Sequence, residues 1–223
     1  TIKYNSTGVQ QWVARYNGPG NGMDDAFSIA VDGSGSVYVT GRSLGSGTNS
    51  DFATIKYNSS GVQQWVARYN GPQNDHDEAY SLAVDSSGNV YVTGSQSEGL
   101  LSYFATIKYN SMGVEQWIKT YKGTGNNGGN AFSIKVDGLG NVYVIGRSDG
   151  GSTFYDYATI KYNTMGDTLW IARYNGPGGS NDIATSLALD GSGNVYVTGR
   201  SQGSGTNYDY ATIKYSSSGI QQW

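Results

Sequence analysis

The sequence predicts an all-β fold, namely a β-propeller of four-stranded antiparallel blades, with about four and a half blades in the chain. A repeated motif, TIKY, begins at Thr1, Thr54, Thr106, Thr159 and Thr212. The spacing between these motifs is 53, 52, 53 and 53 residues, and five tryptophans keep the same period. The 34 glycines, 19 tyrosines and only 14% charged residues favour turns and half-buried strands over helices. A fixed period of this length, holding four short strands, is typical of a propeller blade.

Each repeat contains four predicted strands in a fixed order. In the first complete repeat, β-branched and aromatic residues alternate with small or polar ones over 27–32, 37–41, 52–58 and 62–69. The first-to-second and third-to-fourth connections, such as DGSGS and NSTG, begin with Asp or Asn and contain Gly, which indicates tight hairpins. We expect the first strand of each blade to be the innermost.

The other two connections vary from repeat to repeat, as RSLGSGTNSD and NGPQNDHDEA illustrate. Because strands alternate in direction within a blade, these variable connections all emerge on one face, here called the long-loop face. The hairpins emerge on the opposite face, called the short-turn face. Variable loops on a repeated scaffold commonly carry binding function, so we expect any ligand on the long-loop face.

The chain is expected to form a single propeller segment over 1–223. It comprises a half blade at 1–17 and blades at 27–69, 80–121, 132–174 and 185–223. The chain begins with TIKYNSTGVQQW and ends with TIKYSSSGIQQW, and two such strand pairs cannot complete one blade. We therefore expect residues 1–17 and 212–223 to lie in different blades. We also expect an excerpt from a longer repeat array, with a ring closed between chains as the alternative.

Charge and composition argue against several classes of partner. The net charge of −3 provides no basic field to attract phosphate backbones, so nucleic acid is not an expected partner. No apolar run approaches the roughly 20 residues that span a bilayer, so membrane insertion is not expected. The chain has no cysteine, which excludes disulfides and thiolate metal sites within it.

Two repeated side chains are expected to serve the scaffold. Trp65, Trp117 and Trp170 recur at one strand position, which suits burial between blades, although a sugar-stacking platform is the alternative. A lysine also recurs at one position of the third strand, and we expect it to make a scaffold interaction, such as with an aspartate. The repeated lysines are Lys3, Lys56, Lys108, Lys161 and Lys214.

Residues that break the repeat are better ligand candidates. Phe154, Tyr155 and Tyr208 are predicted loop aromatics that do not recur strictly, with plain loop packing as the alternative. Lys135 stands on an innermost strand where the other three repeats have alanine. It is a candidate for holding an anion, or else it faces solvent in a wide channel.

An acidic loop is a candidate cation site. Within QNDHDEA, the side chains of Asn74, Asp75, Asp77 and Glu78 offer hard oxygen ligands of the kind Ca²⁺ takes. No calcium-loop consensus is present, and a solvated acidic loop is the alternative. His76 is the only histidine, so a cluster of histidines is impossible. We expect no required cofactor, with Ca²⁺ as the one candidate.

The stretch SIAVDGSGSVYVTG, followed by ATIKYNSSGVQQW, resembles SBBP, the seven-bladed beta-propeller repeat family of bacterial secreted and surface proteins. The resemblance covers essentially the whole chain. It implies a module of a large exported protein with no assigned reaction, located outside the cell or on its surface. We therefore expect a non-catalytic scaffold whose long-loop face binds a glycan, a protein or another copy of itself.

An enzyme remains the alternative. A polysaccharide lyase or glycoside hydrolase would use an acidic site on the long-loop face, since glycoside hydrolysis needs two carboxyl groups at a set separation. The acidic residues change from repeat to repeat, and no catalytic residue stands out in the sequence.

Overall fold

The computed structural model describes residues 1–151 and 154–223, and these ranges hold seventeen strands joined by turns and loops. No helix in the described ranges is long and apolar enough to cross a membrane. The strands, in chain order, are β1 Ile2–Tyr4, β2 Gln10–Val13, β3 Asp24–Val31, β4 Val37–Leu44, β5 Ser50–Tyr57, β6 Gln63–Tyr69, β7 Glu78–Val84, β8 Val90–Glu98, β9 Leu101–Tyr109, β10 Glu115–Tyr121, β11 Gly129–Val136, β12 Val142–Asp149, β13 Tyr155–Tyr162, β14 Thr168–Tyr174, β15 Ile183–Leu189, β16 Val195–Gln202 and β17 Tyr208–Tyr215.

The strands form separate antiparallel sheets that follow the chain. Three sheets have four strands each, in the orders β3-β4-β5-β6, β7-β8-β9-β10 and β11-β12-β13-β14. A two-stranded sheet, β1-β2, precedes them, and a three-stranded sheet, β15-β16-β17, follows them. The four-stranded antiparallel blade is therefore confirmed. Residues 1–17 and 212–223 lie in different sheets, as the phase of the repeat predicts.

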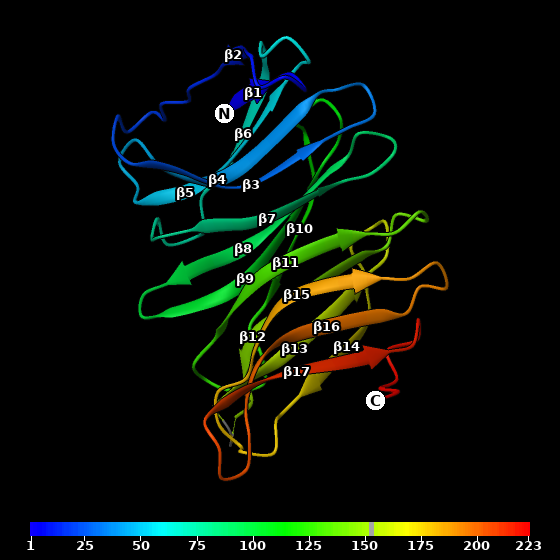
Figure 1. Cartoon of the computed structure of the whole chain (residues 1–223). Helices are drawn as coiled ribbons and strands as arrows, with labels where there is room; N and C mark the ends of the chain where they lie inside the picture. The colour runs from blue at the N-terminus through cyan, green and yellow to red at the C-terminus, as the bar shows by residue number, and fades with distance from the viewer. Residues whose placement is uncertain (152–153) are drawn as a thin grey trace.

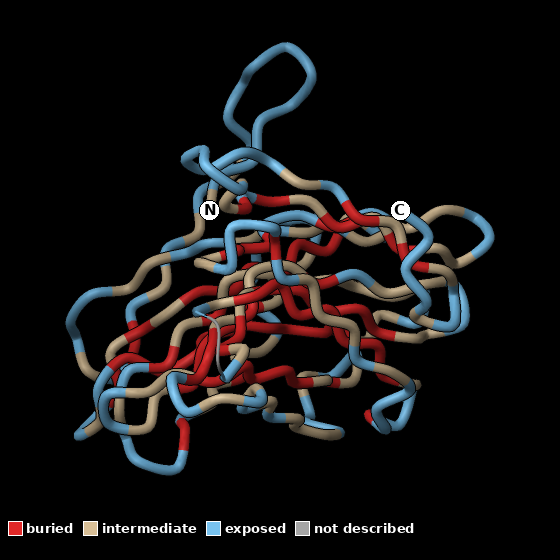
Figure 2. The backbone as a smooth tube through the Cα atoms, turned by 90° about the horizontal axis from the view of Figure 1, so that it is seen from below, coloured by how far each residue is buried: buried red, intermediate tan, exposed pale blue. Residues whose placement is uncertain are grey.

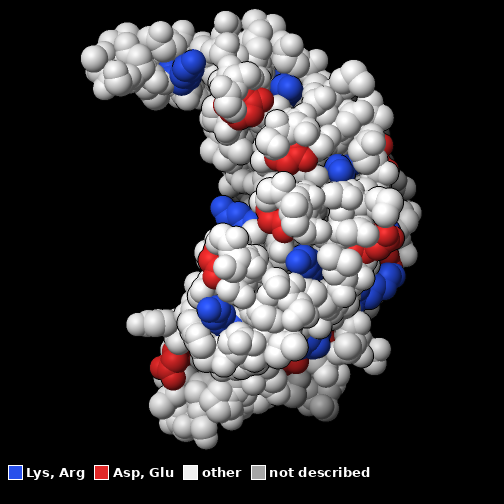
Figure 3. Space-filling model, turned by 90° about the vertical axis from the view of Figure 1, so that its right-hand side faces the viewer, with Lys and Arg blue, Asp and Glu red and all other residues white. Residues whose placement is uncertain are grey.

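The sheets are arranged as successive blades around an open arc. In Figure 1, β3, β7, β11 and β15 lie side by side along the middle of the molecule, and each of these strands contacts the next. The two chain termini lie toward opposite ends of the arc (Figure 1). The space-filling view shows a crescent with one concave side (Figure 3). The first strand of each blade lines that concave side, so it is innermost, as predicted.

The hydrophobic core lies between neighbouring blades. Tyr38 and Phe52 of one blade pack with Leu82 and Val90 of the next, and all four are buried. Equivalent clusters fill the following two junctions. Buried segments run through the middles of the strands, whereas the connections are exposed (Figure 2). Packing between blades thus supplies the apolar burial that a single four-stranded sheet cannot provide by itself.

The hairpins have the chemistry that their sequences predict. The Asp32 carboxylate accepts hydrogen bonds from the backbone N–H groups of Ser34 and Ser36, at 2.9 and 3.0 Å. Gly35 in the same turn has a φ of 78°, a conformation that favours glycine. Local capping by the first Asp or Asn explains why these turns stay constant while the loops on the other face vary.

The first strand of each blade is longer than predicted. β3 begins at Asp24, not at Phe27, because the pairing of β3 with β4 shifts at Phe27 and then continues. Such a bulge adds one unpaired residue to the strand without ending it. Asp24 and Asp25, before the bulge, therefore still pair with residues of β4. Asp25 lies opposite Arg42 in this extension. Hydrophobic alternation could not reveal the extension of β3, because two of its three residues, Asp24 and Asp25, are polar.

Candidate functional site

The repeated tryptophans stabilise the blade junctions at the short-turn end. The Trp65 indole nitrogen donates to the carbonyl oxygen of Ser111 in the next blade, at 3.1 Å. Its ring lies between Tyr38 and Tyr109, with centroids 6.2 and 6.5 Å away. Trp117 and Trp170 have the same arrangement. All three indoles are half-buried, which is less than predicted.

The repeated lysines also serve these junctions, but their partner is not an aspartate. The Lys108 ammonium donates to the carbonyl oxygen of Thr164 at 3.1 Å and lies 5.3 Å from the centre of the Tyr91 ring. Lys56 and Lys161 make equivalent contacts. The hydroxyl of Tyr91 in turn donates to Asp85. The tyrosine ring thus stands between the two charges, so aspartate and lysine do not pair directly.

Shallow clefts separate successive hairpins on the short-turn face. Two of them have volumes of about 600 and 420 Å³, and both are lined by Asp85 and a repeated lysine. Figure 3, viewed toward this face, shows acidic and basic groups spread along the crescent. The clefts repeat with the scaffold, and their charged groups already have the partners described above.

Arginine side chains hold the blades together toward the long-loop end. The Arg68 guanidinium donates to the Asp51 carboxylate at 2.9 Å, to Ser43, and to the hydroxyl of Tyr16 in the preceding blade. Arg173 repeats this fork with Asp156, Ser148 and Tyr121. Both aspartates are buried, so these ion pairs are part of the packed interior.

Buried aspartates fold the loops on the long-loop face. The Asp77 side chain is fully buried and accepts hydrogen bonds from the backbone N–H groups of Gly71 and Ser97. Asp182 is equally buried and accepts from Gly176 and Gln202, at 2.7 and 3.1 Å. Burial raises the pKa of Asp77 to about 6, and the two backbone hydrogen bonds oppose that rise only in part.

The candidate cation ligands do not meet at one point. Asp77 is occupied as just described, and Glu78 pairs with Arg42. Asp75 accepts the backbone N–H groups of His76 and Gly99, at 3.0 and 3.1 Å, and Asn74 accepts from the side chain of Asn70. Across residues 1–151 and 154–223, no three histidine or acidic side chains gather as metal ligands do. The structure therefore does not bring these four oxygen ligands together at one point.

The predicted ligand-binding residues are also separated. Tyr155 and Tyr208 are not in loops; they are the first residues of β13 and β17, where the guanidinium groups of Arg147 and Arg200 lie over their rings at 4.6 Å. Phe154 lies in the loop before β13 and is 64% exposed. Lys135 is exposed on β11 next to the short-turn end, away from these aromatics.

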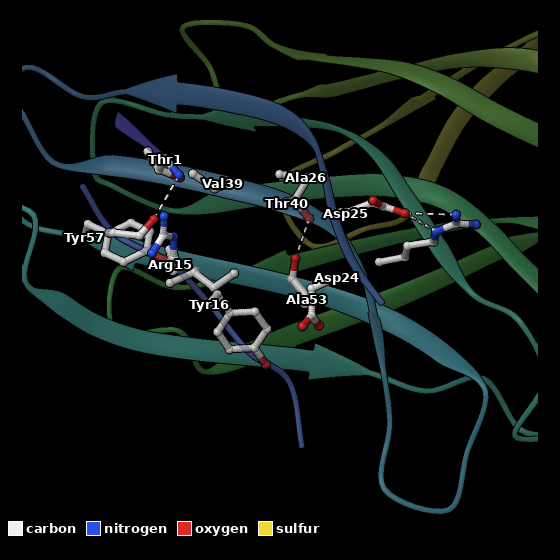
Figure 4. Close-up of a pocket in the computed structure, with 14 residues that line it drawn as sticks. Thr1, Arg15, Tyr16, Asp24, Asp25, Ala26, Val39, Thr40, Ala53 and Tyr57 are labelled. Carbon is white, nitrogen blue, oxygen red and sulfur yellow. Dashed lines mark hydrogen bonds and ion pairs between the residues drawn. The ribbon is translucent and has the colours of Figure 1, made fainter. Parts of the chain in front are cut away.

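A small pocket lies between the two-stranded sheet and the first complete blade. Its volume is about 250 Å³, and its wall is mostly apolar (Figure 4). Two acidic residues line it: Asp24 accepts the backbone N–H of Gly18, and Asp25 pairs with Arg42 at 2.9 Å. Arg15 also lines the pocket. Both carboxylates thus already have partners, which is unlike a pair poised for acid and base roles.

The structure also shows an aromatic group that the sequence analysis missed. Phe27, Tyr80 and Phe132 stand at the bulges of β3, β7 and β11, at the long-loop end of the concave side. Neighbouring ring centres are 5.8 and 5.7 Å apart. We call these three residues the inner aromatic strip. The available signal was the aromatic residue that starts FSIAVD, YSLAVD and FSIKVD but not TSLALD.

The fold and its repeated junctions define the chain as a β-propeller repeat protein. A family model described as SBBP, a beta-propeller repeat, matches residues 11–47, 64–95 and 169–206. Three segments of the chain therefore match the SBBP beta-propeller repeat, which confirms the resemblance seen in its sequence.

Among known proteins, the chain is similar to the regulatory protein FlaEY of Caulobacter vibrioides. The two are 31% identical over 137 residues, which is 55% of this chain and 14% of FlaEY. The chain thus spans about a seventh of the length of that relative.

Solved structures resemble the chain more distantly. A gluconolactonase candidate has a TM-score of 0.49 and 13% identity, over 97% of this chain and 66% of that one. A glycoside hydrolase candidate from Parabacteroides distasonis has a TM-score of 0.47 and 9% identity, over 89% of this chain and 72% of that one. Likenesses this weak provide no argument about activity.

Proposed function

We propose that the chain is a non-catalytic β-propeller scaffold, located outside the cell or on its surface, whose long-loop face mediates binding or self-association. This proposal rests on one observation: the charged side chains toward that face hold the scaffold together. Asp77 and Asp182 fold loops, whereas Arg68 and Arg173 hold buried ion pairs. Groups committed to the scaffold in this way are poorly suited to acid–base chemistry, which needs a group free to exchange protons with a substrate.

The proposed partners are a glycan, a protein or a second copy of the chain. Toward the long-loop end, exposed Phe154 and Tyr208 add aromatic area without the strict repetition of the scaffold residues. Aromatic side chains are effective in recognition because they contribute large contact areas at low conformational entropy. The location outside the cell rests on the resemblance of the repeats to secreted and surface proteins.

An enzyme with an acidic site is the competing proposal. One observation favours it: Asp24 and Asp25 both line the 250 Å³ pocket, together with Arg15 and Arg42. A lyase or glycoside hydrolase would need these carboxylates to exchange their present partners for a sugar during the reaction.

Incubation of the purified chain with plant, algal and bacterial polysaccharides distinguishes the two proposals. We expect no increase in reducing ends or unsaturated sugars, together with retardation in polysaccharide gels or self-association in sedimentation. Tyr208→Ala should weaken the interaction. Product formation that Asp25→Asn abolishes would establish the enzyme instead, and the absence of any interaction on the long-loop face would refute the scaffold proposal.

A further inference from the structure

The inner aromatic strip runs across three blades. Phe27 and Tyr80 are inclined to each other by 39°, and Tyr80 and Phe132 by 42°, so the rings form one continuous series. Phe27 is 45% exposed, and the other two rings are half-buried. The strip is therefore an accessible apolar track. The strands that carry it, β3, β7 and β11, lie next to one another (Figure 1).

The scaffold does not require aromatic residues in the strip. The fourth blade has a bulge with the same register shift, and Thr185 occupies the bulge position there. That blade folds with an exposed threonine in place of a ring. Bulges frequently re-aim a side chain next to a functional site, and here they direct three consecutive rings to one side. Three of the four bulges carry an aromatic residue, although the backbone is the same in all four. Because the fold does not require these rings, their presence points to a role in ligand recognition.

A polar belt accompanies the strip on its loop side. Arg42 bonds to Asp25 in its own blade and to Glu78 in the next, and Tyr80 donates to Glu78 at 2.5 Å. Further along, Arg147 donates to Asn130 at 3.0 Å, and Asn130 donates to Ser95. Acidic and basic groups pair with each other in this belt, so the surface beside the rings is rich in donors and acceptors without a strong excess of either charge.

We propose that the inner aromatic strip binds a neutral oligosaccharide chain, an assignment that rests on the proposed binding function. The C–H faces of sugar rings stack on aromatic rings, and sugar hydroxyls both donate and accept hydrogen bonds. Apolar rings with a few well-placed polar groups are typical of such sites. The ring spacing of 5.7–5.8 Å is comparable to the length of one pyranose in an extended chain, so successive sugars can follow successive blades.

An extended peptide fits this track less well. A peptide that adds to a sheet edge needs a regular row of backbone partners. Each innermost strand is an edge strand, but its bulge lies at the strip and interrupts that row. Charge balance in the belt also disfavours a strongly acidic or basic chain.

The test compares binding of cellohexaose, laminarihexaose and mannohexaose to the 223-residue chain, measured by calorimetry and gel retardation. Tyr80→Thr and Phe132→Thr install the residue that the fourth blade already carries, so the fold should persist. Each should weaken binding about tenfold, whereas Tyr80→Phe, which keeps the ring, should bind as wild type does. Leu139→Ala, which alters an exposed side chain on the short-turn face, is the matched control and should change nothing.

Each other outcome overturns the inference in a distinct way. If all three oligosaccharides bind and Tyr208→Ala abolishes binding while the strip variants do not, the long-loop face is a binding surface but the strip is not the site. If Tyr80→Phe is as weak as Tyr80→Thr, hydroxyl contacts rather than stacking carry the binding. If none of the three oligosaccharides binds, the inference fails, and sedimentation and protein capture still test the proposed function separately.

Discussion

The indole of Trp65 lies so close to Gly113 of the next blade that a Cβ atom at Gly113 would be 2.7 Å from Cδ2 of the indole. Gly113 also has a φ of 79°. Two independent constraints, backbone conformation and the neighbouring ring, therefore select glycine at this position. The same relationship joins Trp117 to Gly166. It links each hairpin to the blade before it and explains why glycine recurs at the end of the turn in NSTG, NSSG, NSMG, NTMG and SSSG.

Gly113→Ala should lower the free energy of unfolding by about 2–4 kcal/mol, because it adds left-handed strain to overpacking against the indole. Urea denaturation measures the effect. Gly33→Ala is the matched control, since Gly33 has no positive φ and no atom within 4 Å of its would-be Cβ. Equal stability of the two variants would show that the indole does not constrain Gly113.

Trp117→Ala should destabilise the chain by about 2–3 kcal/mol, below the range for a fully buried tryptophan because the indole is only half-buried. The variant removes ring contacts with Tyr91 and Tyr162 and the hydrogen bond to Thr164. Trp223→Ala is the control, because Trp223 is 59% exposed. It should lower the free energy of unfolding by less than about 1 kcal/mol, since surface substitutions usually change stability by no more than about 0.5 kcal/mol. Thermal melting that ranks the two variants the other way would contradict this account of the junction.

The buried ion pair of Arg173 and Asp156 should respond differently to single and double substitution. Arg173→Thr alone leaves Asp156 buried without its guanidinium, and we expect a loss of about 3–5 kcal/mol. In the blade formed by β7–β10, Thr120 and Tyr103 stand at the equivalent positions, so both charges are replaced there together. The double variant Arg173→Thr, Asp156→Tyr should therefore recover part of the loss. Additive losses in a double-mutant cycle would mean that the two residues do not interact.

The stability of the chain should depend on the ionisation of Asp77. Because its pKa is raised to about 6 in the folded state, the native chain binds a proton more tightly than the unfolded chain does. This contribution is fully present below about pH 4 and is lost as the pH rises to about 6, amounting to about 2–3 kcal/mol.

Urea midpoints measured from pH 4 to pH 7 test this sign. The wild-type profile should fall more steeply with rising pH than that of Asp77→Asn, which cannot ionise at this position. Parallel profiles for the two proteins would show that Asp77 keeps an ordinary affinity for protons in the folded chain.

Millimolar calcium should leave the melting temperature unchanged relative to chelator, because the oxygens of Asp75, Asp77 and Glu78 engage separate partners. A cation that binds only the folded state would raise stability by about 2.7 kcal/mol at a hundredfold excess over its dissociation constant. Differential scanning calorimetry is the measurement. A calcium-dependent rise in the melting temperature that Asp75→Asn removes would instead support a cation site in this loop.

The sequence alone was sufficient for the architecture because a propeller repeats local information. The TIKY and tryptophan period, the Asp and Asn turns and the alternation of apolar residues all act within one blade or between adjacent ones. Strand order, hairpin geometry and the innermost strand follow from them. The positions of Trp65 and Lys108 in the repeat were thus predictable. The partial exposure of the indole and the carbonyl partner of the lysine were not.

Tertiary structure alone decided which polar and aromatic residues are available to a ligand. From the sequence, Asp77 was a candidate cation ligand or else a residue of a solvated acidic loop, but folding buries it against backbone N–H groups that lie 6 and 20 residues away. Phe27, Tyr80 and Phe132 looked like ordinary strand residues, yet a one-residue bulge turns each of them toward its neighbours on the concave side. The physical reason is that burial and side-chain direction depend on register and on packing between blades, which no single repeat encodes.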